Sequence, residues 1–307
     1  MTGFAVVTRN LVKKRGKCRA LDSLSLSVPR GSILGLVGEN GAGKTTWMMS
    51  VAGFLTPDSG EINILGGGSF DASVHSGRIS ILPQDSELPL EMSPREALYR
   101  FARIQGLSAF SARKSADDVL KAVNLIDRAN APVRTLSHGM RKRAMVAQAF
   151  VGNPEVVLLD EPLNGLDPVE ADRLRRFILS QKSHRTIVIS SHNLEDVERL
   201  CTHVAVIGKG RLKKFDTLQS ITQGAARIVY ELSSKPGNVK RFSELVDGAT
   251  FSFDEEKMSL ECSLDNCSLD IAEVNRVVIP EILKETDIVT ISKGQTLEEA
   301  FLHGRRA

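Results

Sequence analysis

The stretch from Gly38 to Thr46, Gly-Glu-Asn-Gly-Ala-Gly-Lys-Thr-Thr, constrains the fold of this chain more than any other segment. It follows an apolar run at 32–37 that is typical of a buried strand, and it precedes a segment at 47–52 that can continue a helix. Glycines let such a loop bring its backbone N–H groups close to an anion, and the N-terminus of the helix adds partial positive charge at the same place. The sequence therefore predicts a strand, a phosphate-binding loop and a helix in succession.

The side chains of this loop favour a nucleoside triphosphate over a simple anion. Lys44 can direct a full charge at the β- and γ-phosphates, and the Thr45 hydroxyl can ligate Mg²⁺ beside them. A glycine-rich turn that carries a lysine by chance is the alternative, but the strand and helix around the loop make it less favoured. The residues expected to contact the nucleotide here are Gly38, Asn40, Gly41, Ala42, Gly43, Lys44, Thr45 and Thr46.

Composition indicates an ordinary globular protein. The 307 residues allow two domains, taking about 150 residues for each. Hydrophobic residues make up 42% and charged residues 25%, and no apolar run reaches the roughly 18 residues that span a bilayer. The N-terminus lacks a basic segment followed by an apolar core, so we expect a cytoplasmic protein. The net charge of +3 is spread along the chain, which gives no indication of nucleic acid as a partner.

The four cysteines are scattered, and only Cys262 and Cys267 lie close together in sequence. A single Cys-x₄-Cys pair without neighbouring histidines is weak evidence for a metal site, so reduced thiols are the preferred interpretation.

Two acids follow a second apolar run, at 156–159, where a buried strand is expected to stop. Carboxylates are costly there unless a cation or a proton-transfer role compensates. Asp160 is placed to hold Mg²⁺, and Glu161 to polarise a water in line with the γ-phosphate. Gln84 and His192 also follow predicted strands, at 78–83 and 186–191, although a lone histidine is more often structural.

Other segments indicate the surrounding architecture. Alternating apolar residues predict antiparallel strands at 4–8 and 20–28, joined by a basic turn at 13–17 that is either a solvated hairpin tip or a platform beside the nucleotide base. Ser93 and Pro94 begin a helical pattern, and a mostly helical insertion is expected between Gln84 and about Phe150. Beyond about residue 223, strands at 227–232 and 288–291 and a helix at 269–283 suggest a small α+β unit.

Together these landmarks resemble the ATP-binding-cassette (ABC) family of ATPases over about residues 4–220. Gly38–Thr46 is similar to its Walker A motif, Gln84 to the Q-loop glutamine and His192 to the switch histidine. The other matches are Leu136–Met140 for the signature motif, Val157–Glu161 for Walker B and Asn164–Asp167 for the D-loop. The resemblance implies an α/β fold: a P-loop NTPase core with an antiparallel β subdomain and a helical signature subdomain at about 85–150, all within 1–222. Residues 223–307 would form a small accessory α+β domain.

The resemblance also implies cofactors and roles. ATP and Mg²⁺ would bind, with Glu161, His192 and Gln84 catalytic and with Thr45, Gln84 and Asp160 at the metal. Family cassettes stack head to tail, so Ser137, Gly139 and Asp167 would contact the ATP of a second subunit, expected to be a copy of this chain.

Two features depart from the family pattern. The signature reads Leu-Ser-His-Gly-Met instead of the commoner Leu-Ser-Gly-Gly-Gln, which keeps Ser137 and Gly139. Arg15 falls where the family usually has an aromatic residue that stacks on the base. A guanidinium can stack on a purine, with less apolar contact.

For function, the resemblance implies the energy-coupling subunit of a transporter, with a separate permease subunit that spans the membrane. Membrane contact would be through that permease alone, at the inner face of the cell membrane. The segment at 296–303 is similar to the terminal helix of subunits that export drugs, polysaccharides and lipids. The alternatives are a soluble ATPase of DNA repair, chromosome organisation or translation, and a catalytically dead sensor, although Lys44, Asp160 and Glu161 are intact.

Overall fold

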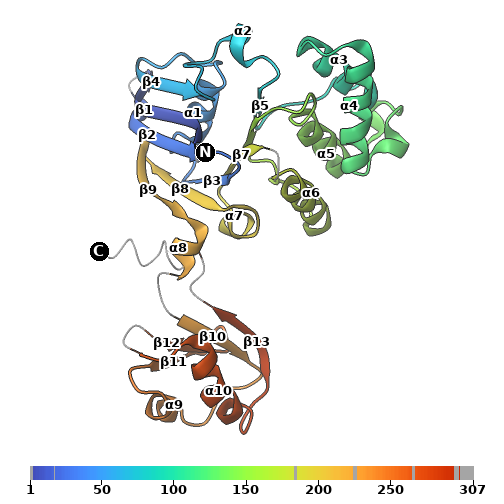
Figure 1. Cartoon of the computed structure of the whole chain (residues 1–307). Coiled ribbons are helices and arrows are strands. Elements are labelled where there is room, and N and C mark those ends of the chain that lie inside the picture. Colours follow the sequence, from blue (N-terminus) through green and yellow to red (C-terminus); the bar gives the residue numbers. More distant parts are fainter. Residues whose placement is uncertain are drawn as a thin grey trace. The chain divides into compact units, whose positions relative to one another are not determined.

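The structure is a computed structural model that describes residues 3–16, 18–182, 185–223, 227–264, 267–293 and Leu297. The chain forms two compact units, Met1–Asp216 and Thr217–Ala307 (Figure 1). Helix α8 (Leu218–Gln223) begins the second unit, so the expected boundary after residue 222 falls near the end of this helix. Each unit is described by itself below.

A three-stranded antiparallel sheet begins the first unit, with strand order β2-β1-β4. Its strands are β1 (Phe4–Arg15), β2 (Cys18–Pro29) and β4 (Ser59–Ile64). Val6 is paired with both Val28 and Ile64, and these three side chains are buried. The alternating pattern of the sequence thus puts one face of this sheet into the core, as predicted for β1 and β2.

A six-stranded sheet forms the centre of the unit, in the order β5-β6-β7-β3-β8-β9. Strands β3 (Ile33–Val37), β6 (Val156–Asp160) and β7 (Thr186–Ser191) are buried along their whole length, which explains their continuous apolar runs. Strands β5 (Ile79–Leu82), β6, β7, β3 and β8 (His203–Gly208) are parallel neighbours, and β9 (Arg211–Thr217) closes the sheet. Their carboxyl ends therefore meet at one edge.

Helix α1 (Lys44–Val51) shares one hydrophobic core with both sheets. Trp47 is fully buried in this core, and its Nε1 donates a hydrogen bond of 3.1 Å to Thr8 Oγ1. The Thr8 hydroxyl donates in turn to Leu26 O at 3.2 Å. The helix that follows the glycine loop is thus fixed against the antiparallel sheet as well as the parallel one.

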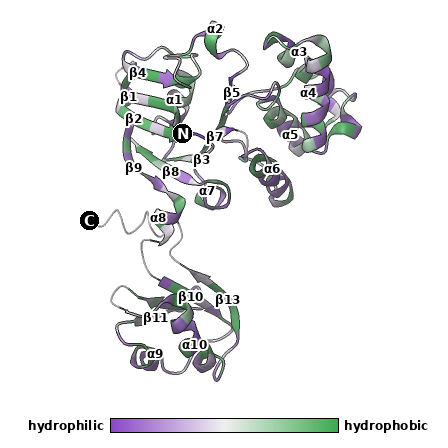
Figure 2. Ribbon diagram, viewed as in Figure 1, coloured by the Kyte–Doolittle hydropathy of each residue, from purple (hydrophilic) through white to green (hydrophobic). Residues whose placement is uncertain are grey.

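The chain between β5 and β6 is mostly helical, as the sequence predicted. It contains α3 (Pro94–Ile104), α4 (Ala109–Ala122) and α5 (His138–Gln148). Ser93 caps α3 by accepting a hydrogen bond from Glu96 N. Hydrophobic and hydrophilic residues both occur along these helices (Figure 2), and the buried ones include Leu98, Ala102, Ala116 and Leu120. Helices α2 (Ala72–His75), α6 (Pro168–Ser180) and α7 (Leu194–Leu200) complete the unit.

After α8, the second unit continues with the element order β-α-β-β-α-β, which is that of a ferredoxin-like fold. Its strands β10 (Arg227–Leu232), β11 (Thr250–Asp254), β12 (Ser259–Ser263) and β13 (Ile288–Lys293) form an antiparallel sheet in the order β11-β12-β10-β13. Helices α9 (Lys240–Leu245) and α10 (Ile271–Ile282) contribute Phe242, Val274, Val278 and Ile282 to its core. The sequence predicted β10, β13 and α10 but missed α9 and the β11–β12 hairpin.

Three further observations bear on the sequence-based expectations. The predicted helix at 296–303 lies outside the described residues, except for Leu297, which is buried. All four cysteines are free. Within the described ranges, no helix combines the length and apolarity required to cross a membrane.

Candidate nucleotide-binding site

The glycine loop lies between the end of β3 and the start of α1, and its backbone requires glycine at specific positions. Gly43 has φ +112°, and a Cβ there would lie 2.5 Å from Ala20 O. A Cβ on Gly38 would lie 2.3 Å from Ile207 O. The loop is further held by a 2.9 Å hydrogen bond from Gly210 N to Ala42 O. Side chains are therefore excluded where the loop turns, and the space is filled by backbone.

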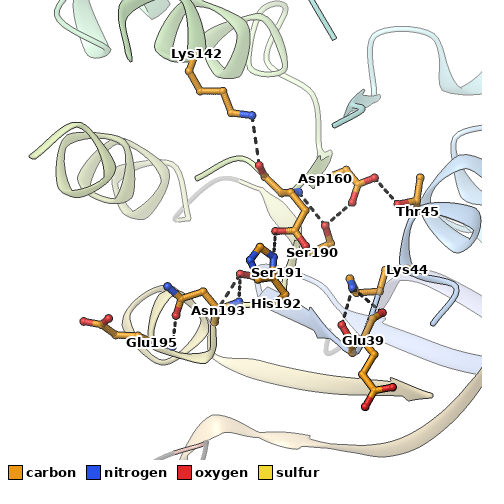
Figure 3. Close-up of polar contacts among 12 residues, drawn as sticks. Glu39, Lys44, Thr45, Lys142, Asp160, Ser190, Ser191, His192, Asn193 and Glu195 are labelled. Carbon is orange, nitrogen blue, oxygen red and sulfur yellow. Dashed lines mark hydrogen bonds and ion pairs between the residues drawn. The ribbon is translucent and has the colours of Figure 1, made fainter. Parts of the chain in front are cut away.

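Lys44 is buried and folds back over this loop. Its Nζ donates to Gly38 O at 2.7 Å and to Glu39 O at 3.3 Å (Figure 3). Both partners are backbone carbonyls of the loop, so the side chain is held at its mouth. Asn40 and Gly41 are exposed on the same loop, whereas Ala42 and Thr46 are buried beneath it. The arrangement brings a cation, loop N–H groups and the N-terminus of α1 together, which suits a polyphosphate.

Asp160 lies beside the first turn of α1. Thr45 Oγ1 donates to Asp160 Oδ2 at 2.7 Å, and Ser190 Oγ donates to Asp160 Oδ1 (Figure 3). The carboxylate is only 2% exposed, and these two partners are neutral hydroxyls. An oxygen-only donor set around a buried carboxylate suits a hard divalent cation such as Mg²⁺.

Glu161 follows Asp160 and adopts an unusual backbone conformation, with φ +49°. Its N–H donates to Ser190 Oγ at 2.9 Å, and its Oε2 lies 2.9 Å from His192 Nδ1. The Glu161 side chain is 9% exposed and that of His192 is 55% exposed. Both residues line a hollow of about 180 Å³, which is also lined by the segment 162–166 and by Asn193. The structure thus brings together two residues that the sequence had placed at the ends of separate strands.

Ser190 is a site residue that sequence reasoning missed. It joins β7 to both acids, because its hydroxyl donates to Asp160 and accepts from the Glu161 N–H. The signal in the sequence was a serine near the end of a strand expected to be buried, because a buried hydroxyl requires a polar partner.

Gln84 lies in a turn after β5 and is exposed. It lines a second hollow together with Asp85, His138 and Lys142. Among the hydrogen bonds of the described residues, none joins Gln84 to Thr45 or Asp160. Its role at the metal stays a prediction.

Ser137, Gly139 and Asp167 lie at the N-termini of two helices. Ser137 caps α5 by accepting from Met140 N at 3.2 Å, and Asp167 caps α6 by accepting from Val169 N and Glu170 N at 3.0 Å each. A Cβ on Gly139 would lie 2.8 Å from Glu170 Cγ, so the two helix starts are in close contact. In the described part of the chain, no hydrogen bond connects these three residues to the 38–46 loop.

Arg15 is the exposed last residue of β1, at the tip of the β1–β2 hairpin, where it is paired with Cys18. The part of β2 next to this tip lies against the glycine loop, since Ala20 O is the atom that a Cβ on Gly43 would meet. Asp58 fixes the hairpin by accepting from Lys14 N at 2.6 Å. Any contact of Arg15 with a nucleotide base remains a prediction.

Comparison with known proteins agrees with this geometry. The family model described as ABC transporter matches residues 21–164. Proteins named Nod factor export ATP-binding protein I are similar: that of Ralstonia nicotianae is 39% identical over 66% of this chain and 63% of its own length. That of Burkholderia thailandensis is 38% identical over 69% of this chain and 67% of its own length. That of Cupriavidus metallidurans is 37% identical over 66% of this chain and 68% of its own length. The matched region therefore spans about two thirds of these relatives.

Solved structures show the same fold. The ADP conformation of an ATP-binding cassette of an ABC transporter superposes with a TM-score of 0.62 at 26% identity, over 71% of this chain and 91% of that one. A dimeric post-hydrolysis cassette bound to ADP and Pi superposes with a TM-score of 0.63 at 22% identity, over 69% of this chain and 98% of that one. The predicted α/β fold class is confirmed. With a phosphate loop, two acids and a histidine gathered at one edge of that fold, the chain belongs to the ABC transporter family and is one of its ATP-binding cassette ATPases.

Proposed function

We propose that this chain hydrolyses ATP to power export through a separate membrane-spanning partner. The observation that carries the hydrolytic part is the 2.9 Å contact of Glu161 with His192, beside the Thr45–Asp160 hydrogen bond. The direction of transport is supported by the relatives, whose names describe export. The transported substrate is not specified by these residues.

Within one site, each side chain has a distinct task. Lys44 and the N-terminus of α1 hold the β- and γ-phosphates. Thr45, Asp160 and, as predicted, Gln84 would hold Mg²⁺, which neutralises charge on the phosphates when it is bound. Glu161 accepts a hydrogen bond from the attacking water and orients it toward the γ-phosphate. His192 fixes the Glu161 carboxylate through Nδ1.

A second copy of the chain would complete the site. Ser137, Gly139 and Asp167 are at exposed helix starts, and their hydrogen bonds in the described chain are local caps. In a head-to-tail pair they would meet the γ-phosphate bound by the other copy, where N–H groups and the positive end of α5 favour an anion. ATP would then stabilise the pair, and hydrolysis would weaken it.

The helical segment and the preceding loop are the proposed contact for the permease, which would hold the chain at the inner face of the membrane. Leu90, Ile104 and Phe110 are exposed there, at 46%, 79% and 81%. Two neighbouring residues suit this contact less, because Leu88 is buried and Arg95 is bound to Asp117, so Leu90 is the better candidate.

Glu161→Gln tests the hydrolytic proposal. The amide keeps the size of the side chain but removes the general base, so turnover should fall by about 100-fold or more. ATP binding should persist, and the variant should accumulate as an ATP-bound dimer in size-exclusion chromatography with light scattering. Glu256→Gln, on the exposed β11–β12 turn, is the matched control. Turnover of Glu161→Gln at the wild-type rate would remove Glu161 from the mechanism.

Purification from native membranes tests the transport proposal. The chain should be recovered with a polypeptide that has several membrane spans, identified by mass spectrometry. Recovery of all the protein in a soluble, partner-free pool would instead favour an ATPase that acts in DNA repair, chromosome organisation or translation.

A further inference from the structure

Lys142 lies on α5, five positions after Ser137, yet its side chain points to the catalytic turn (Figure 3). Its Nζ donates to the backbone carbonyl of Glu161 at 3.4 Å. Burial lowers the pKa of Lys142, while the carboxylates of Glu161, Asp85 and Asp160 act in the opposite direction. The ammonium is thus partly buried and interacts electrostatically with three acids, of which Glu161 and Asp160 belong to the site.

The turn that Lys142 reaches has a disfavoured backbone. Glu161 has φ +49°, in the left-handed region that non-glycine residues seldom adopt. Such a conformation persists only where the surroundings hold it. Here Ser190 Oγ accepts from the Glu161 N–H at 2.9 Å, and the Glu161 carbonyl accepts from Asn164 N at 3.3 Å and from Lys142 Nζ. Lys142 is the one charged donor among these contacts.

We propose that Lys142 is a positioning residue for ATP hydrolysis, which fixes the Glu161 turn from the signature helix. This inference rests on the proposed role of Glu161. The chain's own α5 carries both Ser137, proposed to contact the ATP of the second copy, and Lys142, which holds the turn of the chain's own site. A movement of α5 on pairing therefore changes the orientation of the Glu161 carboxylate, without a change in the phosphate loop.

The predicted signature is a loss of turnover without a loss of binding. Lys142→Gln removes the charge, and Lys142→Met removes the donor while it keeps the apolar stem. Because hydrogen bonds to charged groups contribute more than neutral ones, turnover should fall about tenfold or more in both variants. The affinity for a fluorescent ATP analogue should change by less than about threefold, because Lys44 and the loop are untouched. Lys142→Arg should restore most of the turnover, since it keeps charge and donors.

Lys121→Gln is the matched control, because Lys121 is exposed at the end of α4 in the same helical segment. Thermal unfolding of each full-length variant, followed by circular dichroism, separates positioning from folding. Wild-type turnover in folded Lys142→Gln and Lys142→Met would overturn the inference, and so would a failure of Lys142→Arg to restore turnover.

A pH profile gives a second readout. The charge of Lys142 is influenced by Glu161, directly after β6, by Asp85 and by Asp160, the last residue of β6. The other titratable or charged groups that line the same hollow are Glu87, His138 and Arg141. As the pH rises through the lowered pKa of Lys142, the ammonium loses its proton and turnover should fall. Lys142→Arg stays charged and should lack this alkaline decline; an identical decline in both proteins would contradict the inference. Turnover of Glu161→Gln separates the two proposals: a normal rate there defeats the proposed function itself.

Discussion

Thr45 Oγ1 donates a 2.7 Å hydrogen bond to Asp160 Oδ2, although the two residues are 115 positions apart in sequence. Thr45 is in the first turn of α1 and Asp160 ends β6, so this contact joins the phosphate loop to the acidic strand end. The Asp160 carboxylate is buried, and Ser190 Oγ donates to its other oxygen. Both hydrogen-bond partners are uncharged hydroxyls, so the three side chains offer a set of oxygen ligands that suits a metal ion.

Asp160→Asn should weaken the binding of the Mg²⁺ that ATP hydrolysis requires. The amide is similar in size and can keep one hydroxyl partner, so folding should be preserved. Loss of the charged ligand should raise the Mg²⁺ concentration for half-maximal turnover by about tenfold or more, the equivalent of about 1.4 kcal/mol. Asp118→Asn, at an exposed position on α4, is the control. An unchanged Mg²⁺ titration would show that Asp160 is not a ligand.

Gly43→Ala should destabilise the first unit more than Gly41→Ala does. Both glycines have positive φ, but a Cβ on Gly43 meets Ala20 O at 2.5 Å, whereas one on Gly41 meets nothing within 4 Å. An alanine in the positive-φ conformation alone lowers the free energy of unfolding by about 1–2 kcal/mol. The collision at Gly43 should increase the loss of stability in Gly43→Ala to about 3 kcal/mol or more. Trp47 is the single tryptophan and is buried in this unit, so its fluorescence during urea unfolding reports the difference. Equal losses would mean that the loop can shift away from Ala20.

Mixing two inactive variants tests whether the site is shared between copies. Lys44→Ala lacks the phosphate contact and Ser137→Ala the signature hydroxyl, so each alone should turn over ATP slowly. In a mixed pair, the loop of one variant faces the intact Ser137 of the other, so one complete site forms and turnover should partly recover.

The control for this experiment must account for the second role of Ser137. Its loss also removes the N-cap of α5, which contributes about 1 kcal/mol. Ser93→Ala removes an equivalent cap from α3 and should keep near-normal turnover. A mixture no more active than its components would argue against the head-to-tail arrangement.

The cysteines should differ strongly in their reaction with iodoacetamide at pH 8. Burial raises the pKa of Cys262 to about 12, and the pKa of the buried Cys201 is also raised, by burial and by Asp196. The thiolate fraction of Cys262 is thus lower on the order of a thousandfold than for an ordinary thiol. Peptide mass spectrometry should find Cys18, which is exposed, modified first, and Cys201 and Cys262 modified only after unfolding. Early modification of Cys262 would contradict this burial.

Much of the first unit could be predicted because its signals are local. Strands β3, β6 and β7 are buried on both faces, so each is a continuous apolar run. Gly43 is required by a backbone angle, and Ser93 caps a helix three residues away, so both can be recognised in a short window. In the second unit, the β11–β12 hairpin was missed because the residues that join its strands, at 255–258, include no glycine, proline or asparagine that would indicate a turn.

The sequence by itself determined the phosphate loop, the apolar strands and the order of the motifs, because each depends on neighbouring residues or on a fixed spacing. Only the tertiary structure decided that Ser190 joins the two acids, that Glu161 adopts a left-handed backbone and that Lys142 reaches its carbonyl. These contacts link residues 19–30 positions apart on different elements. They exist because parallel strands end at one edge of a sheet and a helix packs beside them, a proximity that no local pattern encodes.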